Sequence, residues 1–300
     1  MVLRNKIKVF YGLMLGALYS LLFPSIALFA QENKSSLLWE ISGKDLKAPS
    51  YLYGTIHIIC EEDMVMNEKI KDAFKNTEQL VLELDMDDPS MMQDMQKLSV
   101  NPGMENISSS LEEEDLKLLD DFYKDKYGVG MQQLGIMKPF ILMSMMYPYY
   151  LSCDKQASYE TSFMEMAKSQ EKETIGLETL EFQMSIFDNM EKKDQIDMLV
   201  KSVKEFDEMK GEFVEMVEVY RSQDLEALYQ VFKKYPEYVK YEEELLTNRN
   251  KDWIGKISDI ISEKPSFIAV GAGHLGSDNG VIHLLKKAGY NVKPMSNSTN

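Results

Sequence analysis

The C-terminal part of the chain contains the stretch Phe267-Ile268-Ala269-Val270-Gly271-Ala272-Gly273-His274. Four apolar residues in a row are typical of a buried strand, and the glycines that follow predict a sharp turn at its carboxyl end. Residues 281–287 then have the apolar spacing of a helix that stops before Gly289, and residues 290–294 predict a last strand. Strand, glycine-rich turn and helix in this order indicate an α/β sheet.

The first part of the mature chain shows the same kind of pattern. Residues 37–42 and 50–58 are strand-like around a turn-rich segment, which predicts a β-hairpin. Residues 67–76 predict a helix, and residues 79–85 a buried strand whose period of two puts Glu83 and Asp85 on one side. The predicted fold class is therefore α/β (α+β), with a central mixed β-sheet built from both chain ends and flanked by helices.

The segment between these two parts has a different composition. The segment of about residues 90–262 has many methionines and charged residues, and its apolar residues recur with helical spacing. It contains one short strand-like stretch, 174–177. We expect a large helical insertion here, within a single domain over residues 31–300 whose sheet parts are about 37–89 and 265–296. One face of a single long helix is predicted to consist of Ile196, Leu199, Val203, Phe206, Met209, Phe213, Met216 and Tyr220.

The N-terminus has the layout of a secretory signal peptide, with basic residues over 1–8, an apolar stretch over 9–23 and small residues up to Ala30. We expect cleavage after Ala30 and export to the periplasm or the extracellular space, with no stable membrane insertion after signal removal. The alternative is an uncleaved anchor, since residues 9–29 are close to the ~20 that span a bilayer. Cys60 and Cys153 are either joined or are two unpaired thiols.

The acidic net charge argues against nucleic acids and anionic membranes as partners. The chain carries 33 Lys and Arg against 49 Asp and Glu, a formal net charge of −16. Such a protein repels nucleic-acid backbones and anionic membranes. The expected partner is a peptide or small-molecule substrate, and the oligomeric state stays open.

A four-residue pattern, Gly-x-x-His, occurs twice, as Gly54-Thr55-Ile56-His57 and as Gly271-Ala272-Gly273-His274. The first copy lies at the end of a predicted strand segment, and the second directly follows a predicted strand. Ligands of open α/β sheets gather beyond the carboxyl ends of the strands. Two imidazoles and the carboxylate of Glu83, on an adjacent predicted strand, would make a divalent-metal site with open positions for an activated water. The alternative is that both histidines cap strand ends through backbone hydrogen bonds.

Residues 271–276 also match Gly-x-Gly-x-x-Gly, a dinucleotide-binding pattern. We reject this function because only one further strand follows and no acidic residue lies about twenty positions on to hold a ribose. The third histidine, His283, lies one step off the apolar face of its predicted helix, and we expect it to be solvated.

Arg249 falls on the apolar face of a predicted helix that contains Trp253 and Ile257, where a cation is costly unless it is paired. Its partner should be Glu83, Asp85, Glu178 or an anionic group of the substrate. It would either stabilise negative charge in a transition state or form a structural salt bridge. Glu178 ends the strand-like stretch and is a candidate general base, although an acid before a helix is also favoured by the helix dipole.

Five stretches in order resemble the TraB/GumN family, whose relatives include the Tiki-type proteases. They are Tyr51-Leu52-Tyr53-Gly54-Thr55-Ile56-His57, Leu80-Val81-Leu82-Glu83-Leu84-Asp85, Ile175-Gly176-Leu177-Glu178-Thr179-Leu180-Glu181-Phe182-Gln183, Asn248-Arg249-Asn250-Lys251-Asp252-Trp253, and Val270-Gly271-Ala272-Gly273-His274-Leu275 through Gly289-Tyr290. The chain departs from the family pattern at Glu160, where many members have an aspartate, and at Cys60.

The resemblance implies a metal-dependent hydrolytic site, with His57, Glu83 and His274 at the principal positions and Arg249 at another recurrent one. Tiki-type relatives are proteases supported by manganese or cobalt, so we expect an exported metallohydrolase, first of all a peptidase, with Mn, Co or Zn as cofactor. Glu83 would be ligand or general base. Other relatives suggest two alternatives: a non-catalytic haem- or iron-binding protein, and an esterase-like hydrolase that needs no metal.

Overall fold

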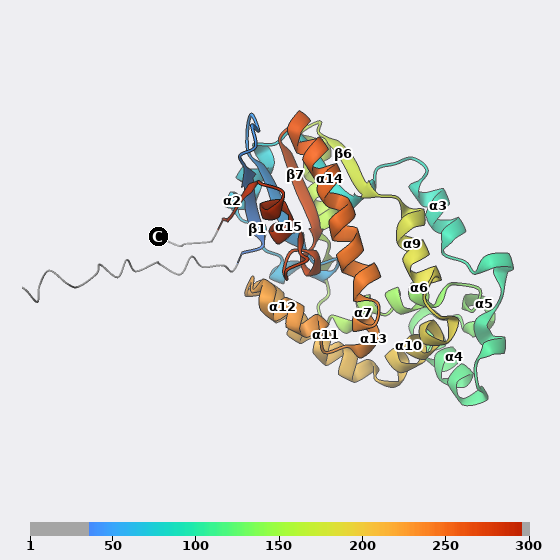
Figure 1. Ribbon diagram of the computed structural model, residues 1–300. Helices are drawn as coiled ribbons and strands as arrows, with labels where there is room; N and C mark the ends of the chain where they lie inside the picture. The colour runs from blue at the N-terminus through green and yellow to red at the C-terminus, as the bar shows by residue number, and fades with distance from the viewer. Residues whose placement is uncertain (1–35, 296–300) are drawn as a thin grey trace, which may run out of the picture. The chain divides into compact units, whose positions relative to one another are not determined.

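The computed structural model describes residues 36–295, and a six-stranded mixed sheet forms their centre (Figure 1). The order of the strands is β6-β4-β7-β2-β1-β8. Their bounds are β1 Leu38–Ser42, β2 Ser50–Thr55, β4 Gln79–Leu84, β6 Glu173–Glu178, β7 Ser266–Gly271 and β8 Asn291–Pro294. Strands from both ends of the chain are therefore neighbours in one sheet, which confirms the predicted fold class.

Four neighbouring strands, β6, β4, β7 and β2, run parallel to one another. Their carboxyl ends consequently lie at one edge of the sheet. The other two strands complete the sheet on the far side, with β1 antiparallel to both β2 and β8. The pair β1 and β2 is the predicted hairpin. This arrangement decides where the functional side chains can meet, because each predicted site residue of the sheet lies at or just after a carboxyl end.

Helices cover both faces of the sheet. On one face an aromatic cluster of Tyr53, Phe74, Phe163 and Phe267 joins β2 and β7 to α2 (Glu68–Lys75) and α8 (Tyr159–Ser169). Asn67 caps the N-terminus of α2, and its side chain accepts a hydrogen bond from the amide of Ile70 at 3.1 Å. On the other face lie α14 (Asn248–Glu263) and α15 (Val281–Lys287), which contact each other (Figure 1).

Most of the remaining chain is helical. The other helices are α3 Met91–Leu98, α4 Glu113–Tyr127, α5 Met131–Leu134, α6 Pro139–Ser144, α7 Tyr147–Tyr150, α9 Leu180–Asp188, α10 Lys192–Lys204, α11 Phe206–Arg221, α12 Leu225–Phe232 and α13 Pro236–Val239. The short elements are the 3₁₀ turns Glu61–Asp63, Pro102–Met104, Ile107–Ser110 and Ala272–His274, the π turn Glu243–Thr247, and a two-stranded ladder of β3 Ile59–Cys60 with β5 Gln156–Ala157.

The prediction of one long helix through residues 196–220 is wrong. Two helices, α10 and α11, meet at Glu205, whose φ of −105° and ψ of 27° are not helical. The turn lets the ring of Phe206 pack against Phe122 and Tyr150, with centroids 5.0 and 5.2 Å apart. Apolar spacing continues across the break because both helices bury the same side. The methionines of this stripe, Met209 and Met216, pack against the hydrophobic core.

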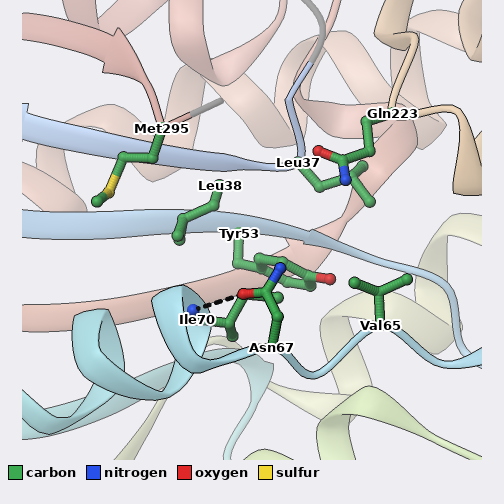
Figure 2. A pocket seen from close by; sticks show the side chains of 8 residues that line it. All are labelled: Leu37, Leu38, Tyr53, Val65, Asn67, Ile70, Gln223 and Met295. Carbon is green, nitrogen blue, oxygen red and sulfur yellow. Dashed lines mark hydrogen bonds between the residues drawn. The ribbon is translucent and has the colours of Figure 1, made fainter. Parts of the chain in front are cut away.

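A small cavity lies beside β2 (Figure 2). Leu37, Tyr53, Asn67 and Ile70 are among its lining residues, and its volume is about 10 Å³. Within residues 36–295 the hydroxyl of Tyr53 is a buried polar group without a hydrogen-bond partner. A volume of this size holds one water molecule at most, so the cavity is a packing feature rather than a ligand site.

The predicted signal peptide, residues 1–30, lies outside the described residues. Among the helices that the structure describes, none combines the length and the apolar composition needed to cross a membrane.

Candidate active site

The residues singled out in the sequence lie at the carboxyl ends of the parallel strands. His57 follows β2, Glu83 is the fifth residue of β4, and Glu178 is the last residue of β6. His274 ends the 3₁₀ turn that follows β7. Because the four strands are neighbours and parallel, their carboxyl ends bring side chains together that are more than 200 residues apart in the sequence.

Arg249 is the centre of this cluster and comes from the first turn of α14. Its Nε lies 3.0 and 3.1 Å from the two carboxylate oxygens of Glu178, and its Nη2 donates to Glu178 Oε2 at 2.8 Å and to Glu83 Oε2 at 2.6 Å. Trp253 Nε1 donates to Glu178 Oε1 at 2.8 Å, and the guanidinium lies over the indole ring, 5.0 Å from its centroid. The buried cation is therefore paired with two carboxylates.

Asp85, a further partner considered for Arg249, is not part of this cluster. In the described part of the chain its Oδ1 is buried without a hydrogen-bond partner. Burial and the neighbouring carboxylate of Asp87 raise the pKa of Asp85 to about 6.

His274 is buried and held in one orientation by two neighbours. Its Nδ1 lies 2.7 Å from Asn250 Oδ1, and Asn250 Nδ2 donates to the carbonyl of Asn279 at 2.9 Å, which fixes the amide so that its oxygen accepts from the ring. The other nitrogen, Nε2, then carries the lone pair and accepts from Arg249 Nη1 at 3.2 Å. Burial lowers the pKa of His274 to about 3, so the imidazole is neutral.

Glu83 lies between Arg249 and the second Gly-x-x-His segment. Its Oε1 accepts from the backbone N–H of Gly271 at 2.8 Å and lies 4.0 Å from His274 Nε2, while Oε2 also accepts from Gln183 Nε2 at 3.2 Å. Burial alone would raise the pKa of Glu83, but the positive charges of Arg249 and His57 and the backbone N–H of Gly271 outweigh this effect and lower the pKa to about 2. Because His274 stays neutral, the guanidinium of Arg249 is the positive charge in direct contact with this carboxylate.

His57 has a separate partner, Glu160, from the first turn of α8. His57 Nδ1 lies 3.2 Å from Glu160 Oε1, and the carboxylate also accepts from Thr55 Oγ1 at 2.7 Å and from Ser158 Oγ at 2.8 Å. The His57 side chain is 76% exposed. Its hydrogen bond to Glu160 raises the pKa of His57 to about 9. Within residues 36–295 the ring makes this one side-chain hydrogen bond, although its charge acts on both Glu83 and His274.

The arrangement around the two histidines bears on the predicted metal site. Across residues 36–295, no three His, Cys, Asp or Glu side chains are placed as a ready metal-binding group. The guanidinium of Arg249 occupies acceptor atoms of Glu83 and His274 that an ion would need, Glu83 Oε2 and His274 Nε2. Both histidines nevertheless direct Nδ1 at a side-chain oxygen, which is how metal-ligating histidines present Nε2. Imidazole nitrogens and a carboxylate oxygen are donor types that a divalent ion takes.

Two glycines allow the close approach of the segments. A Cβ atom at Gly54 would lie 3.0 Å from Leu275 Cδ2 and 3.1 Å from Ala272 Cα. A Cβ atom at Gly271 would lie 3.3 Å from Glu83 Oε1. The first glycine of each Gly-x-x-His motif therefore leaves space for the other motif or for the carboxylate between them.

This packing predicts opposite effects for two glycine substitutions. Gly54→Ala should destabilise the protein by about 1–3 kcal/mol, because the added methyl group overpacks the contact with Ala272. The matched change Gly255→Ala lies within α14 with no atom within 4 Å of the new Cβ, and it should stabilise by about 0.5–1 kcal/mol. Urea denaturation of both variants measures the difference. Equal stability of the two variants would contradict the close approach.

Three polar residues of the site were not found by sequence reasoning. Glu160 and Asn250 hold the two Nδ1 atoms, and Gln183 donates to Glu83 and, at 3.1 Å, to Glu178. Asn250 follows Arg249 directly and lies in a stretch that carries the family resemblance, so it could have been found. Glu160 lies 103 residues from His57. The family resemblance marks its position as one where many members have an aspartate, but not as the partner of His57. His283 is exposed, as predicted.

Comparisons with known proteins give the following matches. The model of the TraB/PrgY/gumN family matches residues 37–294. An uncharacterized protein of Treponema pallidum (strain Nichols) is 23% identical over 278 residues, covering 85% of this chain and 81% of that protein. Metalloprotease TIKI2 of Danio rerio is 21% identical over 320 residues, covering 88% of this chain and 62% of that protein, so the match spans less than two thirds of TIKI2. No solved structure matches the chain significantly.

Proposed function

The chain belongs to the TraB/PrgY/gumN family. On this basis we propose that it is an exported hydrolase and, more specifically, a peptidase. One observation carries the proposal: the histidines of both Gly-x-x-His motifs lie at one sheet edge with Glu83 and a buried arginine. The similarity to a protein named metalloprotease supports the peptidase reaction.

We further propose that a divalent ion, manganese, cobalt or zinc, supports the reaction, with His57, Glu83 and His274 as its ligands. An ion in this place would supply Lewis acidity and a water of lowered pKa. The orientation of both imidazoles through Nδ1 supports this choice of ligands. Glu178 can keep Arg249 paired when Glu83 and His274 are needed as ligands, because it already accepts from Nε and Nη2.

The chain's own residues have distinct roles in this proposal. Arg249 neutralises Glu83 in the resting protein and stabilises the negative charge that develops on a carbonyl oxygen during hydrolysis. Asn250 fixes the tautomer of His274, and Glu160 fixes the orientation of His57. Glu178 keeps Arg249 in place, and we propose this positioning role for it instead of the general base considered from the sequence.

A second candidate is a hydrolase of esters or lactones that needs no metal. The pair of His57 and Glu160 favours it, because an exposed imidazole whose Nδ1 is held by a carboxylate can act as a general base towards water through Nε2 once it has lost its proton, which its pKa of about 9 places at alkaline pH. In that reaction Arg249 alone would balance the charge on the substrate oxygen. Chelator sensitivity distinguishes the two candidates.

The proposed export is supported by the disulfide between Cys60 and Cys153. Disulfides persist in oxidising compartments such as the periplasm and the extracellular space, and they are rare in the cytosol.

Metal removal tests the proposal directly. The purified protein is incubated with a peptide library, without additions, with a chelator, and with the chelator followed by excess manganese, cobalt or zinc. We expect cleavage to fall by at least about 100-fold with the chelator and to return with one ion, because water is a weak nucleophile without a Lewis acid. Chelator-resistant cleavage of esters would favour the second candidate, and no hydrolysis of either class under any ion would contradict a hydrolase.

A further inference from the structure

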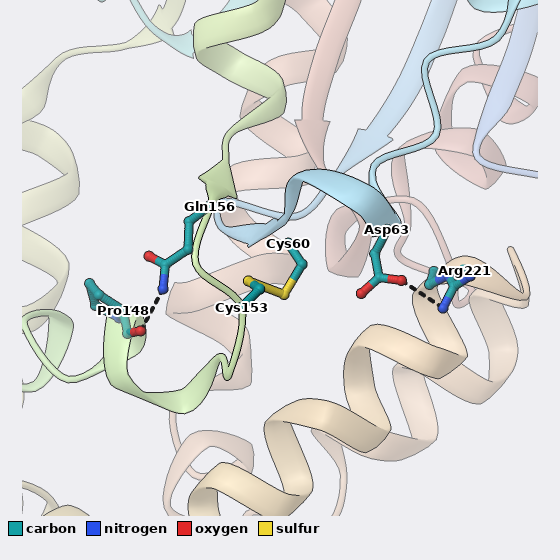
Figure 3. Close-up of a disulfide and its surroundings, with 6 residues drawn as sticks. All are labelled: Cys60, Asp63, Pro148, Cys153, Gln156 and Arg221. Carbon is teal, nitrogen blue, oxygen red and sulfur yellow. Dashed lines mark hydrogen bonds and ion pairs between the residues drawn. A yellow bond between two sulfur atoms is a disulfide. The ribbon is translucent and has the colours of Figure 1, made fainter.

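The Cys60–Cys153 disulfide lies next to the residues that hold His57. Figure 3 shows the bond between Cys60 and Cys153. In the sequence Cys60 is the third residue after His57, and Cys153 precedes Glu160 by seven residues. The bond joins two segments that are 93 residues apart in the sequence, with their Cα atoms 5.9 Å apart. The same two segments carry the two members of the His57–Glu160 pair.

Besides the disulfide, a short backbone ladder and the buried ring of Tyr159, whose hydroxyl accepts from Val65 N at 2.9 Å, join these segments. The strands β3 and β5 are two residues long each and pair Ile59 with Ala157 and Cys60 with Gln156. One further backbone bond joins Glu61 N to the carbonyl of Lys155 at 3.0 Å. A ladder this short is marginal by itself. The covalent bond is therefore the main constraint on residues 153–158, while the buried rings of Tyr159 and Phe163 hold the start of α8 against Tyr53 of β2.

The orientation of His57 depends on that register. Its side chain is largely exposed, so surrounding side chains do not fix the ring by packing, and Glu160 is its hydrogen-bond partner. Glu160 is in turn fixed by Thr55 from the segment of His57 and by Ser158 from its own. A shift of residues 153–158 relative to residues 55–60 would therefore move Ser158 away from Glu160 Oε2 and loosen the carboxylate that holds His57.

We propose that the Cys60–Cys153 disulfide is a positioning element of the active site, which keeps Glu160 on Nδ1 of His57 and makes hydrolysis dependent on the redox state of the two cysteines. The inference rests on the proposed function. Reduction by a dithiol transfers two electrons and two protons to the bond, which gives two cysteine thiols while the reductant forms its own disulfide. Cys153 is partly exposed, so its sulfur can be attacked.

The bond is not needed to hold the six-stranded sheet together, because neither cysteine belongs to it. Reduction should therefore affect the His57–Glu160 pair before it affects the sheet. A purely structural disulfide would instead lower stability without a selective effect on turnover.

The test compares the oxidised protein, the dithiol-reduced protein and the double variant Cys60→Ser/Cys153→Ser, at a temperature at which far-UV circular dichroism shows each to be folded. We expect kcat to fall about tenfold or more and KM to change less than threefold, as for the loss of an orienting partner. The control is Asp63→Asn, which removes the 2.8 Å ion pair between Asp63 and Arg221 on the same segment (Figure 3). It should change kcat less than twofold.

A second readout does not need activity. The ring signals of His57 in carbon-proton NMR, assigned by their loss in His57→Ala, should shift or broaden on reduction, while those of the exposed His283 stay unchanged. Unchanged His57 signals, or an unchanged kcat, would overturn the inference, as would global unfolding on reduction. Shifted His57 signals in a protein that hydrolyses no tested substrate would uphold the positioning role and count against the proposed function alone.

Discussion

His57→Ala should lower kcat/KM for hydrolysis by at least about 10³-fold while the melting temperature changes by less than about 2 °C. The loss is expected because the imidazole is proposed to act at the reacting atoms, where removing one group of a concerted site costs several orders of magnitude. The loss of stability should be small, because the side chain is largely exposed and its removal breaks one ion pair, with Glu160, of a kind that contributes about 0–1 kcal/mol.

The measurement is kcat/KM on the best peptide of the library together with a thermal melt. His283→Ala is the matched control, since His283 is the one other exposed histidine among the described residues. It should leave both quantities unchanged. Activity of His57→Ala within tenfold of the unchanged protein would contradict a catalytic or ligand role for His57.

Glu178→Ala should have the largest effect on stability, about 3–5 kcal/mol, because it leaves a buried guanidinium without its main partner. The Glu178 side chain is 2% exposed and accepts from Arg249, Trp253 and Gln183. Trp253 Nε1 would also lose its acceptor inside the core, which adds a desolvation cost. For a domain of this size the melting temperature should fall by roughly 10 °C.

Urea and thermal denaturation measure this loss. The control is Glu173→Ala at the exposed start of the same strand, where the carboxylate is 3.5 Å from Lys264 in a surface ion pair. Such a pair contributes about 0–1 kcal/mol, so its removal should be barely detectable. Similar effects of the two changes would show that Arg249 does not depend on Glu178.

Strands and helices of the sheet region could be predicted from the sequence, because each of them follows from the spacing of apolar residues within its own short segment. The apolar run of 267–270 and the spacing of apolar residues in 281–287 each occur in the structure as a strand and a helix with almost the same bounds. The break at Glu205 could not be predicted, since the apolar spacing continues through it and the turn serves the packing of Phe206.

Part of the candidate site could be predicted because one residue carries a charge in an apolar position. Arg249 stands on an apolar helix face, and that alone required a buried anion, which the structure provides as Glu83 and Glu178. The family resemblance marked Glu160 only as a departure from an aspartate, and its pairing with His57 was not predicted, because an acid in the first turn of a helix is ordinary. The sequence also left the pairing of Cys60 with Cys153 open, and the structure shows the disulfide.

In the proposed reaction His57 and His274, from opposite ends of the chain, act on the same reacting atoms. A double-mutant cycle of His57→Ala, His274→Ala and the combined variant, measured as kcat/KM on one substrate, tests whether they do. If the residues act as one unit, the combined variant should be no more than about tenfold slower than either single variant. Losses that multiply across the two changes would show two independent contributions and contradict the claim.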